Sequence, residues 1–153
     1  MQALDDLKAV LAGEIASCGF PDIPYAQFLG FKAQKSEQTG ELVIVMPYSE
    51  HLIGTPQPAR LHGGTVAALL EFAGSMAVTY AAAAQQAATF TAMPKPISVT
   101  TEFMRGGAPE EMFARAEVLR LGRRVGNVRA LAWQGDPNKV NATATMTFLM
   151  PGV

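Results

Sequence analysis

The chain has 153 residues, of which 49% are hydrophobic and 16% charged, and its formal net charge is −1. This composition excludes a disordered chain, and it offers no general basic surface for a nucleic-acid partner. Cys18 is the single cysteine, which excludes a disulfide within the chain and favours a cytoplasmic location.

The first predicted element is an amphipathic helix over residues 2–17, because Leu4, Leu7 and Leu11 recur at helical spacing. Gly19 and Pro21 are expected to end it, and Cys18 is expected to be a small buried residue on it. We assign residues 1–20 to this helix as part of the same domain as residues 21–153.

Two strands are predicted next. Residues 21–27 are expected to form a loop, followed by a strand over 28–37, a turn at Thr39-Gly40 and a strand over 41–46. The segment 47–60 holds three prolines and a glycine, so we expect a structured loop there.

A long helix is predicted over residues 62–86, where the residues are strong helix formers apart from Gly74. Residues 66–84 are long and apolar enough to raise a transmembrane interpretation. Glu71 in the middle and the lack of basic flanks argue against it, since a carboxylate within a bilayer is costly. We therefore expect a core helix of a soluble protein and no membrane partner.

The remainder reads as four strands after a proline-rich break over 89–96. The predicted strands cover residues 97–103, 113–120, 125–133 and 140–148, with turns at glycines and at 135–138 between them. Consecutive strands indicate an antiparallel sheet, and one long helix can be wrapped by it. The predicted class is α+β, with about six strands.

Two glycines stand where the long helix begins. Gly63 and Gly64 lie in a first turn, where backbone N–H groups lack partners and the helix dipole is positive. These donors could hold a carbonyl oxygen that becomes negative during acyl transfer. Alternatively, the glycines simply permit a tight turn, and both interpretations remain open.

Glu71 is the one acidic residue of the long helix. A carboxylate among apolar neighbours must be paired, hydrogen-bonded or neutral, unless it points into solvent. Ser75 follows four residues later on the same face, where it could hold a water or bond back to the helix backbone. His62 could orient the loop or donate to a substrate oxygen. No metal-ligand cluster is visible, and no cofactor is expected.

"LHGGTVAALLEFAGSMA" resembles the signature of PaaI-type (phenylacetyl-CoA thioesterase) hotdog-fold thioesterases. These share an HGG, an acid eight residues after the first glycine, and a small hydroxylated residue four further on. "HLIGTPQPARLHGG", "SVTTEFMRG" and "LGRRVGNV" are also similar to that family, and the likeness spans roughly residues 28–150.

The resemblance implies a hotdog fold, in which a curved antiparallel sheet wraps a central helix. It implies hydrolysis of acyl-CoA by Glu71, as nucleophile or general base, while the Gly63 amide polarises the thioester carbonyl. Ser75 would help to place water. Homodimers with active sites at the subunit interface are implied, and such dimers often pair into homotetramers.

The substrate-binding residues that the resemblance implies are Arg105, Arg123 and Arg124, beside the coenzyme A nucleotide, together with Gly64 next to the amide of Gly63. Many relatives have Asn where Thr55 stands, whereas others place a Gln one position from Gln57, so either residue could contact the thioester. Independently of any family, four arginines surround one predicted turn and could bind a polyanionic carrier or form a solvated rim: Arg120, Arg123, Arg124 and Arg129.

Two other functions are compatible with this fold. One is a non-catalytic acyl-CoA sensor or binding module, although such regulators usually carry a DNA-binding segment, and the short acidic N-terminal helix expected here counts against that interpretation. The other is a hotdog dehydratase or hydratase, whose relatives use a histidine and an acid in a different pattern. The sequence leaves the acyl group open between aromatic, medium-chain and branched.

Overall fold

The computed structural model describes residues 2–85 and 90–151. In chain order its elements are α1 (Gln2–Ala12), β1 (Ser17–Cys18), α2 (Pro24–Leu29), β2 (Lys32–Lys35), β3 (Leu42–Met46), the 3₁₀ helix η1 (Glu50–Leu52), β4 (Ile53–Pro56), β5 (Ala59–Leu61), α3 (Gly63–Gln85), β6 (Lys95–Phe103), β7 (Met112–Leu121), β8 (Val125–Trp133) and β9 (Val140–Leu149).

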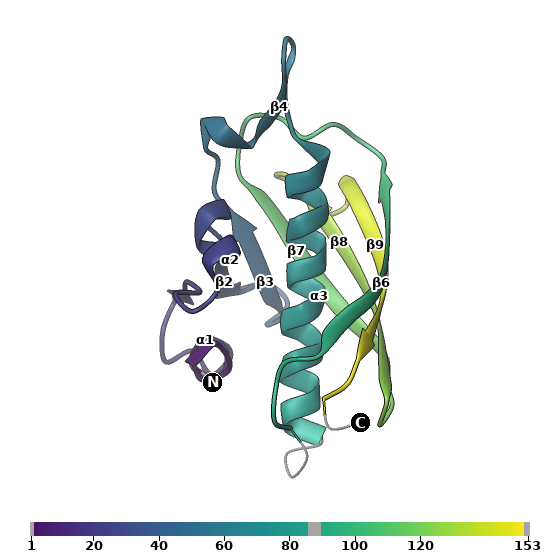
Figure 1. Cartoon of the computed structure of the whole chain (residues 1–153). Coiled ribbons are helices and arrows are strands. Elements are labelled where there is room, and N and C mark those ends of the chain that lie inside the picture. The colour runs from purple at the N-terminus through teal and green to yellow at the C-terminus, as the bar shows by residue number, and fades with distance from the viewer. Residues whose placement is uncertain (1, 86–89, 152–153) are drawn as a thin grey trace.

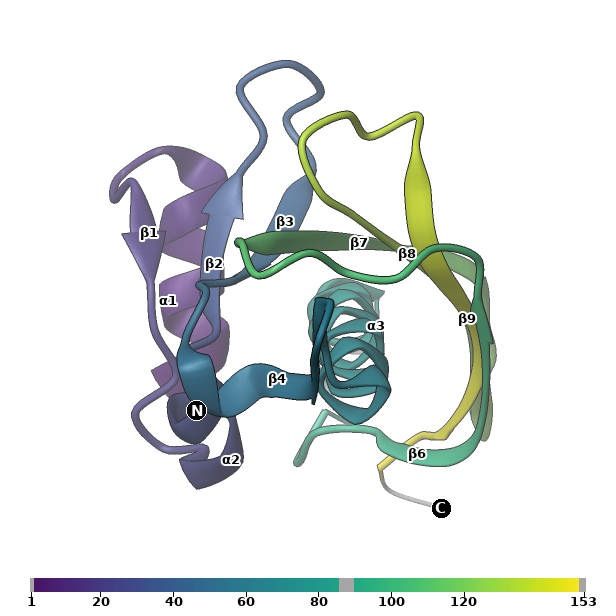
Figure 2. The ribbon, with the colours of Figure 1, turned by 90° about the horizontal axis from the view of Figure 1, so that it is seen from above.

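One curved sheet surrounds α3. Its seven strands follow the order β1-β2-β3-β7-β8-β9-β6, and every neighbouring pair is antiparallel. Figure 1 shows α3 lying along the sheet, and Figure 2 shows it nearly end-on, with the sheet curving round it. The predicted α+β hotdog architecture is confirmed, although the sheet has one strand more than expected and β4 and β5 form a separate hairpin.

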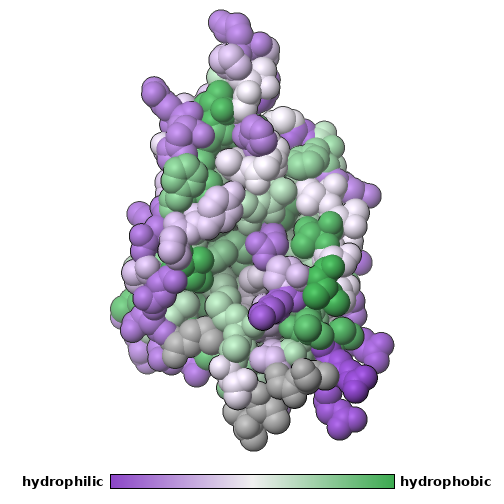
Figure 3. Space-filling model, in the orientation of Figure 1, coloured by the Kyte–Doolittle hydropathy of each residue, from purple (hydrophilic) through white to green (hydrophobic). Residues whose placement is uncertain are grey.

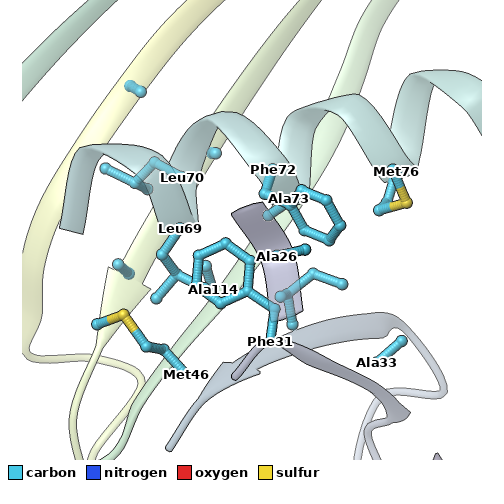
Figure 4. Packing of buried hydrophobic residues seen from close by; sticks show 14 of the residues in the cluster. Ala26, Phe31, Ala33, Met46, Leu69, Leu70, Phe72, Ala73, Met76 and Ala114 are labelled. Carbon is cyan, nitrogen blue, oxygen red and sulfur yellow. The ribbon is translucent and has the colours of Figure 1, made fainter. Parts of the chain in front are cut away.

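The core lies between α3 and the inner face of the sheet. Phe72 contacts Phe20 edge-on at 4.6 Å between ring centroids, and Phe31 at 5.1 Å. Figure 4 shows Phe31 and Met46 pointing from the sheet side towards Leu69 and Phe72 of the helix. Burial of these large apolar groups is the main favourable contribution to folding.

The N-terminal helix is shorter than predicted. α1 ends at Ala12, because Gly13 takes the left-handed conformation with φ 78°, a common way to end a helix. The prediction that Cys18 lies buried on this helix is wrong, since Cys18 belongs to β1, is half-buried and pairs with Ala33 of β2.

The next segment also differs from the prediction. Pro24 begins a short helix, α2, within the expected loop, and Gly30 ends it with φ 72°. The expected strand over 28–37 is therefore limited to β2 at 32–35. The segment 47–60 contains η1 and the β4–β5 hairpin, which projects beyond the start of α3 (Figure 1).

The long helix and the four later strands are confirmed. α3 covers residues 63–85, while Gln86 and Thr89, which the predictions included, lie outside the described residues. α3 is long and apolar enough to cross a membrane, but 56% of its most apolar stretch is buried inside the fold. It is the core helix.

β6 is an edge strand with an exposed apolar face. Val99 stands opposite the buried Met146, whose side chain reaches α3 at Gly74, so this face of β6 looks towards the helix. Ile97, Val99 and Phe103 are nevertheless 59%, 41% and 58% exposed. Figure 3 shows apolar atoms gathered along this side of the molecule.

Candidate functional site

His62 takes up most of the donors in the first turn of α3. The N–H of Gly64 donates to its Nδ1 at 2.8 Å, and the N–H groups of Thr65 and Val66 donate to its carbonyl oxygen at 3.0 and 3.4 Å. In the described part of the chain, the N–H of Gly63 has no acceptor. It is therefore the one first-turn donor left for a ligand.

Gly63 borders a pocket of about 260 Å³ between the start of α3 and the end of β6. Phe103 approaches closely, because a Cβ at Gly63 would lie 3.4 Å from its ring. The other lining residues are Leu61, Val66, Met104, Arg105, Gly106 and Gly107. The structure thus brings two predicted residues, Gly63 and Arg105, to one pocket, whereas Gly64 does not line it.

Arg60 is a second cation beside this pocket, and it was not predicted from the sequence. Its side chain lies across Gly106, with Cδ 3.1 Å and Nε 3.2 Å from where a Cβ would stand. Among the described residues, neither Arg60 nor Arg105 forms an ion pair. The only signal in the sequence was its position two residues before His62.

Glu71 is hydrogen-bonded to Ser75. The Ser75 hydroxyl donates to Oε1 of Glu71 at 3.0 Å, so this serine does not bond back to the helix backbone. Ser75 is buried and Glu71 half-buried, on a strip of α3 that the sheet leaves partly open with Ala67 and Ala68. The carboxylate is oriented by its neighbour rather than free in solvent.

Gly63 and Glu71 are too far apart to act together within one chain. Eight residues separate them, which is about 12 Å along a helix axis. An oxyanion donor and an attacking group must each lie about 3 Å from adjacent atoms of one carbonyl. Glu71 accordingly does not line the pocket at Gly63.

The remaining predicted residues lie elsewhere. Thr55 and Gln57 are exposed on the projecting β4–β5 hairpin and do not line the pocket at Gly63. Arg123 and Arg124 are exposed in the β7–β8 turn, at the end of the sheet where Lys95 of β6 lies. Phe103 and Gly63 mark the opposite end, so one chain does not bring these arginines to Gly63.

The arrangement offers groups suited to acyl transfer. It holds an amide without an acceptor among the described residues beside a pocket, Arg105 lining that pocket, Arg60 against Gly106 at its edge, and a carboxylate that accepts a hydrogen bond from a hydroxyl. Among residues 2–85 and 90–151, no three His, Cys, Asp or Glu side chains gather closely enough to hold a metal ion.

Residues 54–149 match the model of the acyl-CoA thioesterase N-terminal domain family. The chain is also similar to solved structures: a Chromobacterium violaceum protein at 27% identity, covering 100% of this chain and 99% of that one with a TM-score of 0.67, and a Shewanella oneidensis protein related to the thioesterase superfamily, at 19% identity, 97% of both chains and a TM-score of 0.73.

A third solved structure is a phenylacetic acid degradation-related protein from Ralstonia eutropha. It is 23% identical, with 95% of this chain and 99% of that one covered and a TM-score of 0.67. The structures below 25% identity support the fold alone. No curated protein matches the sequence.

Proposed function

This chain belongs to the acyl-CoA thioesterase family, and from that premise we propose that it hydrolyses acyl-CoA thioesters to a free acid and CoA, with Glu71 as nucleophile or general base. The observation that carries the proposal is the N–H of Gly63, which has no acceptor among the described residues and borders a pocket, on the same helix as a carboxylate that accepts a hydrogen bond from a hydroxyl.

Two routes use these groups. As nucleophile, a Glu71 oxygen attacks the thioester carbon, the C–S bond breaks, and water then cleaves the resulting anhydride. As general base, Glu71 removes a proton from water, the hydroxide attacks the same carbon, and the proton passes to the leaving thiolate. In both routes the Gly63 N–H stabilises the oxyanion. Ser75 orients the carboxylate.

We propose that each site combines Gly63 of one protomer with Glu71 of the partner. The separation of about 12 Å along α3 prevents one chain from supplying both groups. A second copy removes this difficulty. In an isologous dimer the same surface of both protomers forms the interface, so Gly63 of each protomer can lie beside Glu71 of the other.

The exposed edge strand β6 supports such a dimer. An edge strand presents unpaired backbone groups to another chain, and β6 adds an exposed apolar face towards the helix side. Antiparallel pairing of β6 with its copy would bring the Phe103 end of one protomer to the Lys95 end of the other. We also propose that such dimers pair into a homotetramer in the cytoplasm, and that residues 21–153 form a single domain that α1 joins.

The proposed carrier-binding groups are Arg60 and Arg105, with Arg123 and Arg124 from the partner's end of the paired sheet. Guanidinium groups form charge-assisted bonds with phosphates, and CoA carries several. Thr55 or Gln57 on the projecting hairpin could reach the thioester from a neighbouring protomer.

The alternative function is a non-catalytic acyl-CoA-binding module on the same fold. An assay of free-thiol release with a panel of aromatic, medium-chain and branched acyl-CoAs distinguishes the hydrolase from the binding module. Turnover of at least one substrate supports hydrolysis and identifies the acyl class. Tight binding without thiol release across the panel would favour the binding module.

A further inference from the structure

We propose that His62 is a positioning residue that caps α3, and that Gly54 provides the space that this cap requires. Within the described residues, His62 leaves the Gly63 N–H as the only first-turn donor without an acceptor. This inference rests on the proposed thioesterase function, because it assigns the group that fixes the oxyanion donor. Neither the sequence pattern nor the family match assigns a role to Gly54.

The bonds of His62 define a helix cap. Its Nδ1 accepts from Gly64, and its carbonyl oxygen accepts from the N–H of Thr65 and, at 2.7 Å, from the Thr65 hydroxyl. Its own N–H donates to the carbonyl oxygen of Leu52 at 2.8 Å, which ties the cap to the end of η1. Side-chain acceptors at this position satisfy otherwise unpaired N–H groups.

This bonding pattern fixes the role of the ring. A nitrogen that accepts a hydrogen bond carries no proton, so the neutral ring holds its proton on Nε2. Nδ1 therefore has no proton to donate to a thioester oxygen. The ring instead accepts the hydrogen bond of the Gly64 N–H. That N–H is then not available to an oxyanion, which leaves the N–H of Gly63 as its donor.

Gly54 is the residue that makes room for this cap. A Cβ at Gly54 would lie 2.7 Å from Cα of His62 and 2.9 Å from its Cβ and Cδ2, closer than real contacts allow. A Cβ at Gly64 would lie 2.9 Å from Nδ1 of the same ring. The exposed histidine thus lies close against two glycines, and a methyl group at residue 54 must displace its backbone.

The first experiment compares His62→Asn with His62→Ala. The Asn Oδ1 sits on Cγ as Nδ1 does, and asparagine is among the best helix caps. We expect His62→Asn to keep kcat within about threefold of wild type, and His62→Ala to lose roughly five- to tenfold with KM unchanged. A similar loss of about 100-fold or more in both variants would identify a proton carrier and overturn the proposal.

The second experiment compares Gly54→Ala with Gly74→Ala. Both positions lack room for a Cβ, but at Gly74 the obstacle is the flexible end of Met146, away from the first turn. We expect Gly54→Ala to lower kcat about tenfold with KM unchanged, whereas Gly74→Ala lowers the melting temperature and keeps kcat. Unchanged kcat in folded Gly54→Ala would overturn the role of Gly54.

A spectroscopic measurement separates this inference from the proposed function. The scalar coupling across the N–H···N bond between Gly64 N and His62 Nδ1 reports the cap directly in ¹⁵N-labelled protein. We expect the coupling in wild type and Gly74→Ala, and its loss in Gly54→Ala. Its absence in wild type would overturn the cap, whereas failure of wild type to hydrolyse any acyl-CoA would overturn the proposed function.

Discussion

The hydroxyl of Ser75 donates a hydrogen bond of 3.0 Å to the carboxylate of Glu71, one helical turn away. This bond links an acidic side chain to its nearest polar neighbour on a helix whose other residues carry no formal charge. A charge-assisted hydrogen bond of this kind restricts the rotamers of the carboxylate. The pair therefore orients one Glu71 oxygen and leaves the other for a substrate or water.

Glu71→Gln should abolish most hydrolysis while keeping the fold. The amide preserves the volume and still accepts from Ser75, but it cannot attack a thioester or remove a proton from water. We expect kcat to fall by about 100-fold or more. Thiol release from the best acyl-CoA of the panel measures the loss, and circular dichroism checks the fold.

Ser75→Ala is the matched comparison, because it removes the orienting hydroxyl and keeps the carboxylate. Its kcat should fall less, by roughly tenfold, since one orienting bond is lost. Near-normal turnover by folded Glu71→Gln would contradict the assignment of Glu71.

Gly63→Pro should remove the oxyanion donor without breaking α3. Proline has no N–H, and it is well tolerated at the first position of a helix. We expect kcat to fall by about 100- to 1,000-fold, the size seen when one oxyanion donor is removed.

Mixing inactive Gly63→Pro and Glu71→Gln chains tests whether the site is shared between protomers. A mixed dimer would hold one complete site, formed by Gly63 of the Glu71→Gln chain and Glu71 of the other. A statistical mixture should then recover about a quarter of wild-type activity. If each chain supplied its own site, the mixture would stay as inactive as its parents.

The sequence predicted the later part of the fold better than the first. The alternation of apolar and polar residues in 140–148 reports one buried face, and β9 buries Ala142, Ala144, Met146 and Phe148 as expected. At the N-terminus, Gly13 ends the helix earlier than the repeat of leucines suggested. The periodicity of apolar residues indicates which face of a helix is buried, but it does not show that Gly13, in the left-handed conformation, ends the helix.

The sequence placed candidate groups relative to one another only within one segment. The spacing of Glu71 and Ser75 put them on one helix face, because residues four apart share a face, but their direct hydrogen bond was not predicted. Arg60 and Gly54 were missed, since their roles depend on contacts with Gly106 and His62 that only the fold creates. No local pattern reports a contact between a hairpin and a distant loop.

Arg60→Ala should weaken the binding of CoA thioesters but not of truncated ones. Arg60 lies beside the Gly63 pocket without an ion pair in the described chain, so it can bind a phosphate of the carrier. We expect KM for acyl-CoA to rise by about three- to tenfold, and KM for the matching N-acetylcysteamine thioester, which has no phosphate, to stay unchanged.

Arg115→Ala serves as the control for that measurement. Arg115 pairs with Glu41 and lies over Trp133, and its ion pair does not reach the Gly63 pocket. Its loss should leave both KM values as in wild type. An equal rise with both substrates in Arg60→Ala would show that Arg60 acts on structure rather than on the carrier.

Val99→Asp should separate the proposed dimer and remove activity together. Val99 lies in the middle of β6 and is 41% exposed on its apolar face, so a buried aspartate there would lack a partner in the dimer. Light scattering after size exclusion should give a monomer mass. Leu119→Asp, at a comparably exposed leucine on β7, should keep the dimer. A fully active monomeric Val99→Asp would exclude a shared site.

The thiol of Cys18 should make stability fall at high pH. Burial raises the pKa of the Cys18 thiol, the charge of Asp6 adds to this rise, and a hydrogen bond with the backbone of Ala33 opposes it. The folded state thus holds the thiol proton more tightly than the unfolded state does. In the unfolded state the thiol titrates at about pH 8.5. The stabilisation is complete below that pH and is lost as pH rises through the raised value.

Denaturant unfolding of wild type and Cys18→Ser at about pH 7 and about pH 10 measures this effect. Serine does not titrate in this range. The unfolding free energy of wild type should therefore fall relative to that of Cys18→Ser between the lower and the higher pH. Asp6→Asn should reduce this shift only in part, because burial is the larger cause. A difference that stays constant between the two pH values would mean that the thiol titrates alike in both states, and hence that β1 does not shield Cys18 in solution.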